Sequence, residues 1–257
     1  MNLLEEITKV FADNGLVGAF LMVGAVMMVS YFVSRRLTMG RIHGSAIAIM
    51  IGLALAYWGG TQSGGTKGLA DIKLFAGLGL LGGGMLRDFA ITATAFEVDV
   101  DEAKKAGMLG AIALAFGTVV PFIFGCCLAW AFGYRDAVSI TTIGAGAGSY
   151  IIGPVTGAAL GASSAVMALA IATGVLKAVT VMIVTPFLAK LIGVNNPQSA
   201  MAFGGCIGTV SGVTGGLAAT DPRLVPYGAL TATFHTGIGC LVTPSIGFLA
   251  VRAIVGG

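Results

Sequence analysis

Charged residues are scarce in this sequence. Only 10% of the 257 residues are Asp, Glu, Lys or Arg, whereas 56% are hydrophobic. A soluble domain is about one-quarter charged, because its surface must face water. The 14 basic and 11 acidic residues fall mostly between long apolar runs. The composition therefore excludes a water-soluble domain and predicts an all-α, polytopic membrane protein, with the lipid bilayer as the solvent around most of residues 1–257.

Several functional signatures are also missing. The net charge is only +3 and no basic tract interleaves with aromatic residues, so no nucleic-acid partner is expected. The four cysteines lie in apolar runs without a Cys-x-x-Cys pair, which favours small buried residues over metal ligands. No nucleophile elbow, HExxH motif, P-loop or dinucleotide fingerprint is present. We therefore expect no enzymatic activity and no cofactor.

The apolar runs that are present have the length of membrane-spanning helices, which need about 20 apolar residues. The segment 1–14 is different, because it carries Glu5 and Glu6 where a signal peptide would be basic. Its apolar residues recur at helical spacing, which predicts a short helix on the membrane surface or a frayed end. The sequence predicts about six full spans, at 16–33, 46–58, 74–95, 107–132, 165–191 and 227–251.

Basic residues in short loops indicate the orientation of such a chain. Arg35, Arg36 and Arg41 follow the first predicted span, which places that loop in the cytoplasm. Lys67 and Lys73 then fall on the outside, which is a weak conflict with the same rule.

Two apolar segments, 139–164 and 199–221, contain too many glycines for ordinary continuous helices, and the first also holds Pro154. Each contains Val-Thr-Gly, and Thr214 lies 58 positions after Thr156. This similarity indicates either a repeat or a chance likeness between Gly-rich segments. We interpret the segments as re-entrant hairpins that enter from opposite sides, as in an inverted repeat. If both instead cross fully, the chain has about eight spans.

Interrupted helices at membrane depth are typical of binding sites. Backbone that is not helical must there be covered by protein or line a water-filled cavity. The breaks expose N–H groups and helix N-termini that suit a carboxylate, and a pair of them is typical of a transporter midplane site. Close helix packing through small residues is the alternative. The predicted substrate-binding residues in these segments are Ser149, Thr156, Gly157, Ser163, Ser164, Ser211, Thr214 and Gly215, and the predicted coupling-ion residues are Gly153, Thr220 and Asp221.

Ionisable residues inside spans are costly and usually functional. Lys177 lies near the middle of its span and is predicted to act as a counter-charge to substrate or in an ion pair. Arg87 has a guanidinium that matches a carboxylate, although Asp88 beside it also suits a structural pair. His235 is either a satisfied buried histidine or a proton-linked residue. Asp221 precedes a proline, which indicates a hairpin end with a sodium-ligand role as one interpretation.

Long stretches of the sequence resemble a known family. They are SRRLTMGRIHGSAIAI (34–49), GLADIKLFAGLGLLGGGMLRDFAI (68–91), TTIGAGAGSYIIGPVTGAALGASS (141–164) and GGLAATDPRLVPYGALTATFHTG (215–237). They are similar to the MadM family, the larger membrane subunits of bacterial malonate:sodium symporters. The resemblance implies malonate as the substrate, sodium or protons as the coupling ion, a smaller MadL-like membrane subunit as the partner, and a bacterial inner membrane as the location.

The predicted function is therefore secondary active uptake of malonate by symport with sodium, or with protons, in a complex of two kinds of subunit. A passive anion channel and a structural subunit that binds no substrate are the alternatives. Malonate is a dianion, so one sodium leaves a net charge of −1 and two sodium ions make the step electroneutral. Sodium is the only bound ion that we expect, and a higher oligomer remains an open alternative.

Overall fold

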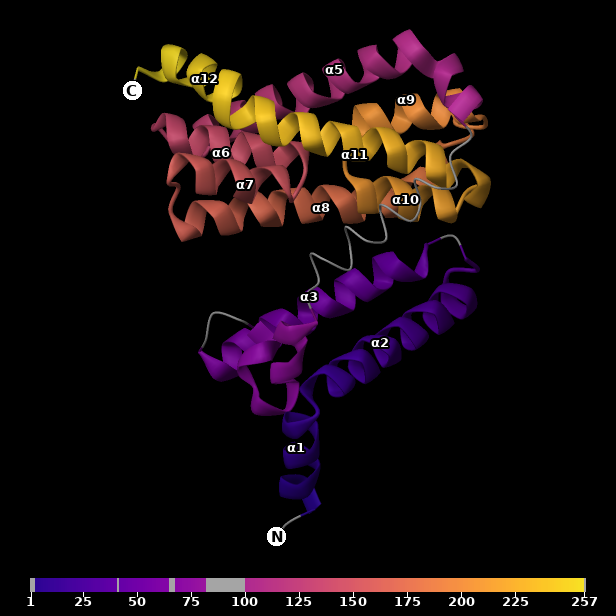
Figure 1. The fold of residues 1–257 in the computed structure, drawn as a ribbon, viewed down its shortest axis with the longest axis vertical. Coiled ribbons are helices and arrows are strands. Elements are labelled where there is room, and N and C mark those ends of the chain that lie inside the picture. Colours follow the sequence, from indigo (N-terminus) through magenta and orange to yellow (C-terminus); the bar gives the residue numbers. More distant parts are fainter. Residues whose placement is uncertain (1–2, 41, 65–67, 82–99, 257) are drawn as a thin grey trace. The chain divides into compact units, whose positions relative to one another are not determined.

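Every regular element in the described part of the chain is a helix. The computed structural model describes residues 3–40, 42–64, 68–81 and 100–256, and no strand occurs in these ranges (Figure 1). The predicted all-α fold is therefore confirmed. The chain divides into two compact units, 1–90 and 91–257, which are described separately below.

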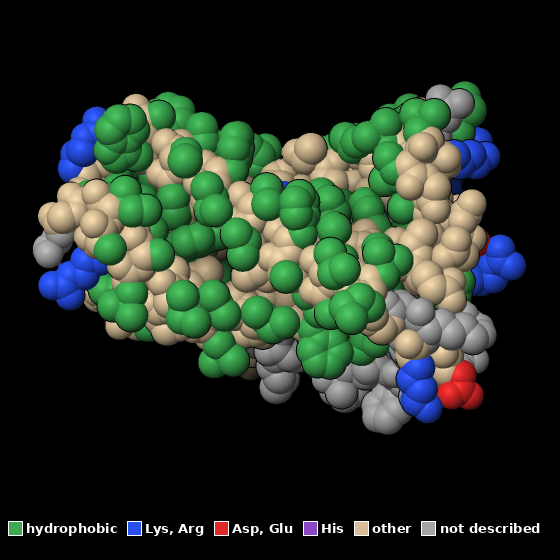
Figure 2. Space-filling model, turned by 90° about the horizontal axis from the view of Figure 1, so that it is seen from above, with side chains coloured by type: hydrophobic (Ala, Val, Ile, Leu, Met, Phe, Trp, Pro, Cys, Tyr) green, Lys and Arg blue, Asp and Glu red, His purple; other side chains and the backbone are tan. Residues whose placement is uncertain are grey.

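The described helices carry large apolar side chains on their outer surfaces. Phe124, Leu176 and Leu241 are 63%, 70% and 74% exposed, which would be unfavourable in water but suits lipid. Figure 2 shows hydrophobic side chains over much of one face, with Lys and Arg mainly toward its ends. The helices that are long and apolar enough to cross a membrane are Gly15–Leu37, Gly44–Ser63, Gly107–Ala131, Ala165–Leu188 and Pro222–Val255.

The first unit contains a helical hairpin. Helices α2 and α3 pack against each other, and the turn between them is fixed where the Ser34 hydroxyl donates to the Ile42 carbonyl at 2.6 Å. The third predicted span, 74–95, falls partly on a 3₁₀ helix, and its residues 82–95 lie outside the described ranges. The elements are α1 (Leu3–Asp13), α2 (Gly15–Leu37), α3 (Gly44–Ser63), η1 (Gly68–Asp71) and η2 (Lys73–Leu80).

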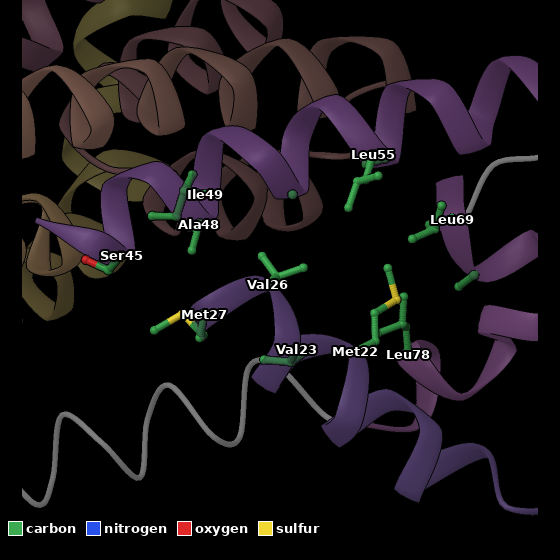
Figure 3. Close-up of a pocket in the computed structure, with 14 residues that line it drawn as sticks. Met22, Val23, Val26, Met27, Ser45, Ala48, Ile49, Leu55, Leu69 and Leu78 are labelled. Carbon is green, nitrogen blue, oxygen red and sulfur yellow. The ribbon is translucent and has the colours of Figure 1, made fainter. Parts of the chain in front are cut away.

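A groove of about 630 Å³ lies between these elements (Figure 3). Its lining includes Met22, Val26, Ile49 and Leu78, and Ser45 is the one polar side chain among the described residues that line it. Such a surface suits a lipid chain or an apolar helix and offers no counter-charge for an anion.

The second unit is built from long helices that hold two interrupted ones. Helix α5 packs against both α6 and α9, and α8 packs against α6, α7 and α10. Helix α11 continues through a π-helical turn into α12. The elements are α5 (Val100–Ala131), α6 (Ala137–Gly148), α7 (Ile152–Leu160), α8 (Ser164–Leu188), α9 (Pro197–Ile207), α10 (Val210–Ala218), η3 (Pro222–Leu224), α11 (Val225–Val242), η4 (Thr243–Gly247) and α12 (Phe248–Val255).

Both Gly-rich segments are broken helices, as predicted. Segment 139–164 forms α6 and α7, and segment 199–221 forms α9 and α10. None of these helices exceeds 12 residues, so at 1.5 Å per residue each is at most about 18 Å long, against about 30 Å for the hydrocarbon core. In Figure 1, α6 and α9 begin at opposite ends of this unit and both lead to its middle. The two pairs therefore approach each other as opposed hairpins.

The two pairs also begin with the same local structure. The Asp136 side chain caps α6 by accepting from the Ser139 N–H at 2.7 Å, and the Asn196 side chain caps α9 by accepting from the Ser199 N–H at 2.9 Å. Helix α10 begins and ends 58 positions after α7 does. The caps and the matching bounds favour a true repeat over a chance likeness.

Candidate functional site

The two hairpins turn back on either side of one histidine. The first turn comprises residues 149–151, between α6 and α7, and the second turn comprises Gly208 and Thr209, between α9 and α10. A Cβ on Gly148 would lie 3.8 Å from His235 Nε2, and a Cβ on Gly208 would lie 2.3 Å from the same atom. The imidazole ring of α11 therefore lies between the two turns.

His235 is fully buried and only half satisfied. Its Nδ1 lies 3.1 Å from the carbonyl oxygen of Gly205, which can only accept, so Nδ1 carries the hydrogen. In the neutral ring Nε2 is then an acceptor, and it has no hydrogen-bond partner in the described part of the chain. Nδ1 is therefore hydrogen-bonded, as expected of a buried structural histidine. A proton-linked role for Nε2 stays a prediction.

Lys177 fixes the first turn from the middle of α8. Its Nζ donates to the carbonyl oxygens of Ala147 and Gly148, at 3.0 and 2.9 Å, where α6 ends. These partners are carbonyls at the negative end of a helix dipole rather than a carboxylate. An ammonium has three donors, so one remains for another acceptor.

The ends of the short helices give the space around the turns a positive character. Helices α7 and α10 both begin at the turns, so their N-terminal dipole ends point there. Neither helix has a side-chain cap, and the first helical bond of α10 runs from the Val213 N–H to the Thr209 carbonyl. The negative end of α6 is offset by Lys177. The arrangement suits an anion.

Some of the predicted substrate residues lie at or beside the turns. Ser149 is in the first turn, is fully buried and accepts from the Ile151 N–H at 3.5 Å. Ser211 lies in the first turn of α10, and the Thr214 hydroxyl donates to its carbonyl at 3.3 Å. Gly153 is the second residue of α7, and a Cβ there would lie 2.8 Å from the Cβ of Ala170.

Other predicted residues lie at the outer ends of the hairpins. The Ser163 side chain caps α8, and the side chain of Ser164 lies outside the described part. The Thr220 hydroxyl donates to a carbonyl within its own helical turn. Asp221 accepts two side-chain hydrogen bonds from Arg223, which hold its pKa below the usual value. Helix α10 separates Thr220 and Asp221 from the second turn, so the structure does not bring them together with Gly153. Arg87 lies outside the described residues.

The short helices of the hairpins also pack closely against neighbouring helices, as the middle of α7 shows. The Thr156 hydroxyl lies 2.6 Å from that of Thr243, which itself donates to the Gly239 carbonyl, so Thr156 is the donor. A Cβ on Gly157 would lie 2.7 Å from Met167. A Cβ on Gly215 would lie 2.9 Å from a side-chain atom of α8. Small residues therefore do serve helix packing here, while the turns themselves form the break.

Thr209 is a residue of the second turn that no sequence pattern had indicated as a site residue. Its hydroxyl is fully buried and has no partner in the described part of the chain. The Gly208-Thr209 pair follows Gly148-Ser149 by 60 positions, whereas the Val-Thr-Gly match has a spacing of 58. Alignment of Gly208-Thr209 with Gly148-Ser149, each a glycine followed by a residue with a hydroxyl group, would have identified Thr209.

Comparison with known proteins adds the family. The family model described as malonate/sodium symporter MadM subunit matches residues 7–255, which is nearly the whole chain. No curated protein and no solved structure matches. The match agrees with the apolar helices described above. The chain therefore belongs to the MadM family of malonate/sodium symporter subunits.

Proposed function

We propose that this chain carries malonate inward across a bacterial inner membrane by symport with sodium, or with protons, as one subunit of a complex with a smaller MadL-like membrane subunit. The observation that carries the proposal is the meeting of both hairpin turns with Lys177 and His235 in the middle of long apolar helices. An alternating-access carrier needs one polar site that can be opened to either side, and opposed hairpins provide such a site.

Ion coupling follows from the charge of the substrate. Moving one negative charge into a negative interior costs about 2.3 kcal/mol per 100 mV, and a dianion meets this cost twice. Lys177 offsets part of the charge while malonate is bound, but as a protein residue it adds nothing to the net charge moved in a full transport cycle. Co-transported cations would therefore have to supply the remaining compensation.

The test is malonate uptake into membrane vesicles that contain both subunits. We expect saturable accumulation that depends on an inward sodium or proton gradient. Each gradient is collapsed in turn with a selective ionophore, and vesicles without the smaller subunit serve as the control for the partner. Uptake that continues unchanged when both gradients are absent would reject ion coupling.

The same vesicles separate the two alternatives. A passive channel would equilibrate malonate but never accumulate it above the outside concentration. A structural subunit would leave the binding to its partner, so malonate binding by this purified chain alone would count against that interpretation.

A further inference from the structure

Thr209 lies where a helix cap is expected and yet does not cap. It is the residue before the first residue of α10, the position at which a Thr hydroxyl usually accepts from a first-turn N–H. No such bond is present, and the hydroxyl is fully buried without a partner among the described residues. Burying a hydroxyl without a hydrogen bond costs free energy, and a bound polar ligand would remove that cost.

The surroundings of Thr209 offer further donors. The side-chain contact with α10 is made by its methyl group, which lies 2.6 Å from the position of a Cβ on Gly212. The first N–H groups of any helix lack partners within the helix, and no side chain caps these. The same Gly212 position lies 3.1 Å from the Ala178 carbonyl oxygen, so α10 starts beside the residue that follows Lys177.

The corresponding hydroxyl of the first hairpin is in a different state. Ser149 stands 60 positions before Thr209 and also follows a glycine. Its hydroxyl accepts from the Ile151 N–H within the first turn. Of the two turn hydroxyls, only that of Thr209 has no hydrogen-bond partner in the described part of the chain.

We propose that the second turn binds one carboxylate of the substrate, through the Thr209 hydroxyl and the first-turn N–H groups of α10. This assignment rests on the proposed function and makes it specific. The charges favour an anion over the coupling cation, because the N-terminus of α10 and the Lys177 ammonium are both positive.

The experiment replaces Thr209 by valine, which keeps the shape and removes only the hydroxyl. At saturating sodium we expect the apparent KM for malonate to rise about tenfold or more, as for loss of a hydrogen bond to a charged group. Thr209→Ser keeps the hydroxyl and should stay close to wild type. Thr141→Val is the matched control, because Thr141 is also fully buried with an unpartnered hydroxyl but lies well before the turn, within α6.

The possible results all decide the assignment. It is supported if Thr209→Val raises the malonate KM and neither Thr209→Ser nor Thr141→Val does. It is overturned if the KM stays at the wild-type value, if Thr141→Val raises it equally, or if only the apparent sodium constant changes at saturating malonate. Thr209→Ala serves in place of the valine variant should that one fail to reach the membrane. Absence of uptake by the wild-type complex would instead count against the proposed function.

Discussion

Replacing Lys177 by alanine is expected to lower malonate uptake about a hundredfold or more, while the protein stays in the membrane. Removing one partner of a buried charge interaction costs about 2–5 kcal/mol, which corresponds to at least tens-fold in rate or affinity. The ammonium lies at the junction of the hairpins with one donor beyond the two that Ala147 and Gly148 use. The initial rate of uptake is measured in vesicles and corrected for the amount of protein in the membrane.

A second substitution separates the charge of Lys177 from its contact with α6. Glutamine is neutral but can still donate to a helix-end carbonyl. Compared with Lys177→Ala, Lys177→Gln should therefore be more stable but should transport malonate hardly better. Lys190→Ala is the control, because Lys190 is an exposed lysine beyond the end of α8. Near-normal uptake by Lys177→Gln would show that the charge is not needed and would remove Lys177 as a counter-charge to malonate.

The breaks in the helices could be predicted because their causes are local. Glycine density and Pro154 disfavour a continuous helix whatever surrounds it. The capping side chains Asp136 and Asn196 precede α6 and α9 in the sequence and fix where each begins. Both hairpins therefore occur within a few residues of the predicted segments, and neither needed long-range information.

The composition of the site could not be predicted in the same way, because it depends on packing between distant residues. Gly208 meets His235 across 27 positions of the chain, and Lys177 meets Gly148 across 29. Thr220 and Asp221 belong to the second Gly-rich segment, but α10 extends about 14 Å from the turn to its far end. Membership of a hairpin thus did not imply membership of its turn. Thr209 was missed because the Val-Thr-Gly spacing of 58 does not align it with Ser149, which stands 60 positions before it.

Replacing Gly208 by alanine is expected to reduce uptake to background and to lower the melting temperature. Gly208 has φ +73°, a left-handed conformation in which any other residue is strained by about 1–2 kcal/mol. In addition, the new Cβ would lie 2.3–2.4 Å from three atoms of the His235 ring. Such overlap must displace either the ring or the second turn, and overpacking of this kind typically costs about 1–3 kcal/mol more.

Gly161→Ala is a matched control for the backbone strain alone. Gly161 ends α7 with φ +71°, but a Cβ there would meet no heavy atom within 4 Å. We therefore expect Gly161→Ala to lose only about 1–2 kcal/mol of stability and to keep most of its uptake. If Gly208→Ala transported malonate as well as Gly161→Ala does, close contact between the second turn and the ring would not be required.

A double substitution tests whether the clash with the ring is the cause. His235→Ala removes the atoms that the new Cβ of Gly208→Ala would strike, so the pair should recover part of the melting temperature that Gly208→Ala loses. Uptake should not recover, because the double variant also lacks the imidazole between the two turns. Additive losses of stability in the two single variants would instead show that Gly208 and His235 act independently, and that the second turn is held by other contacts.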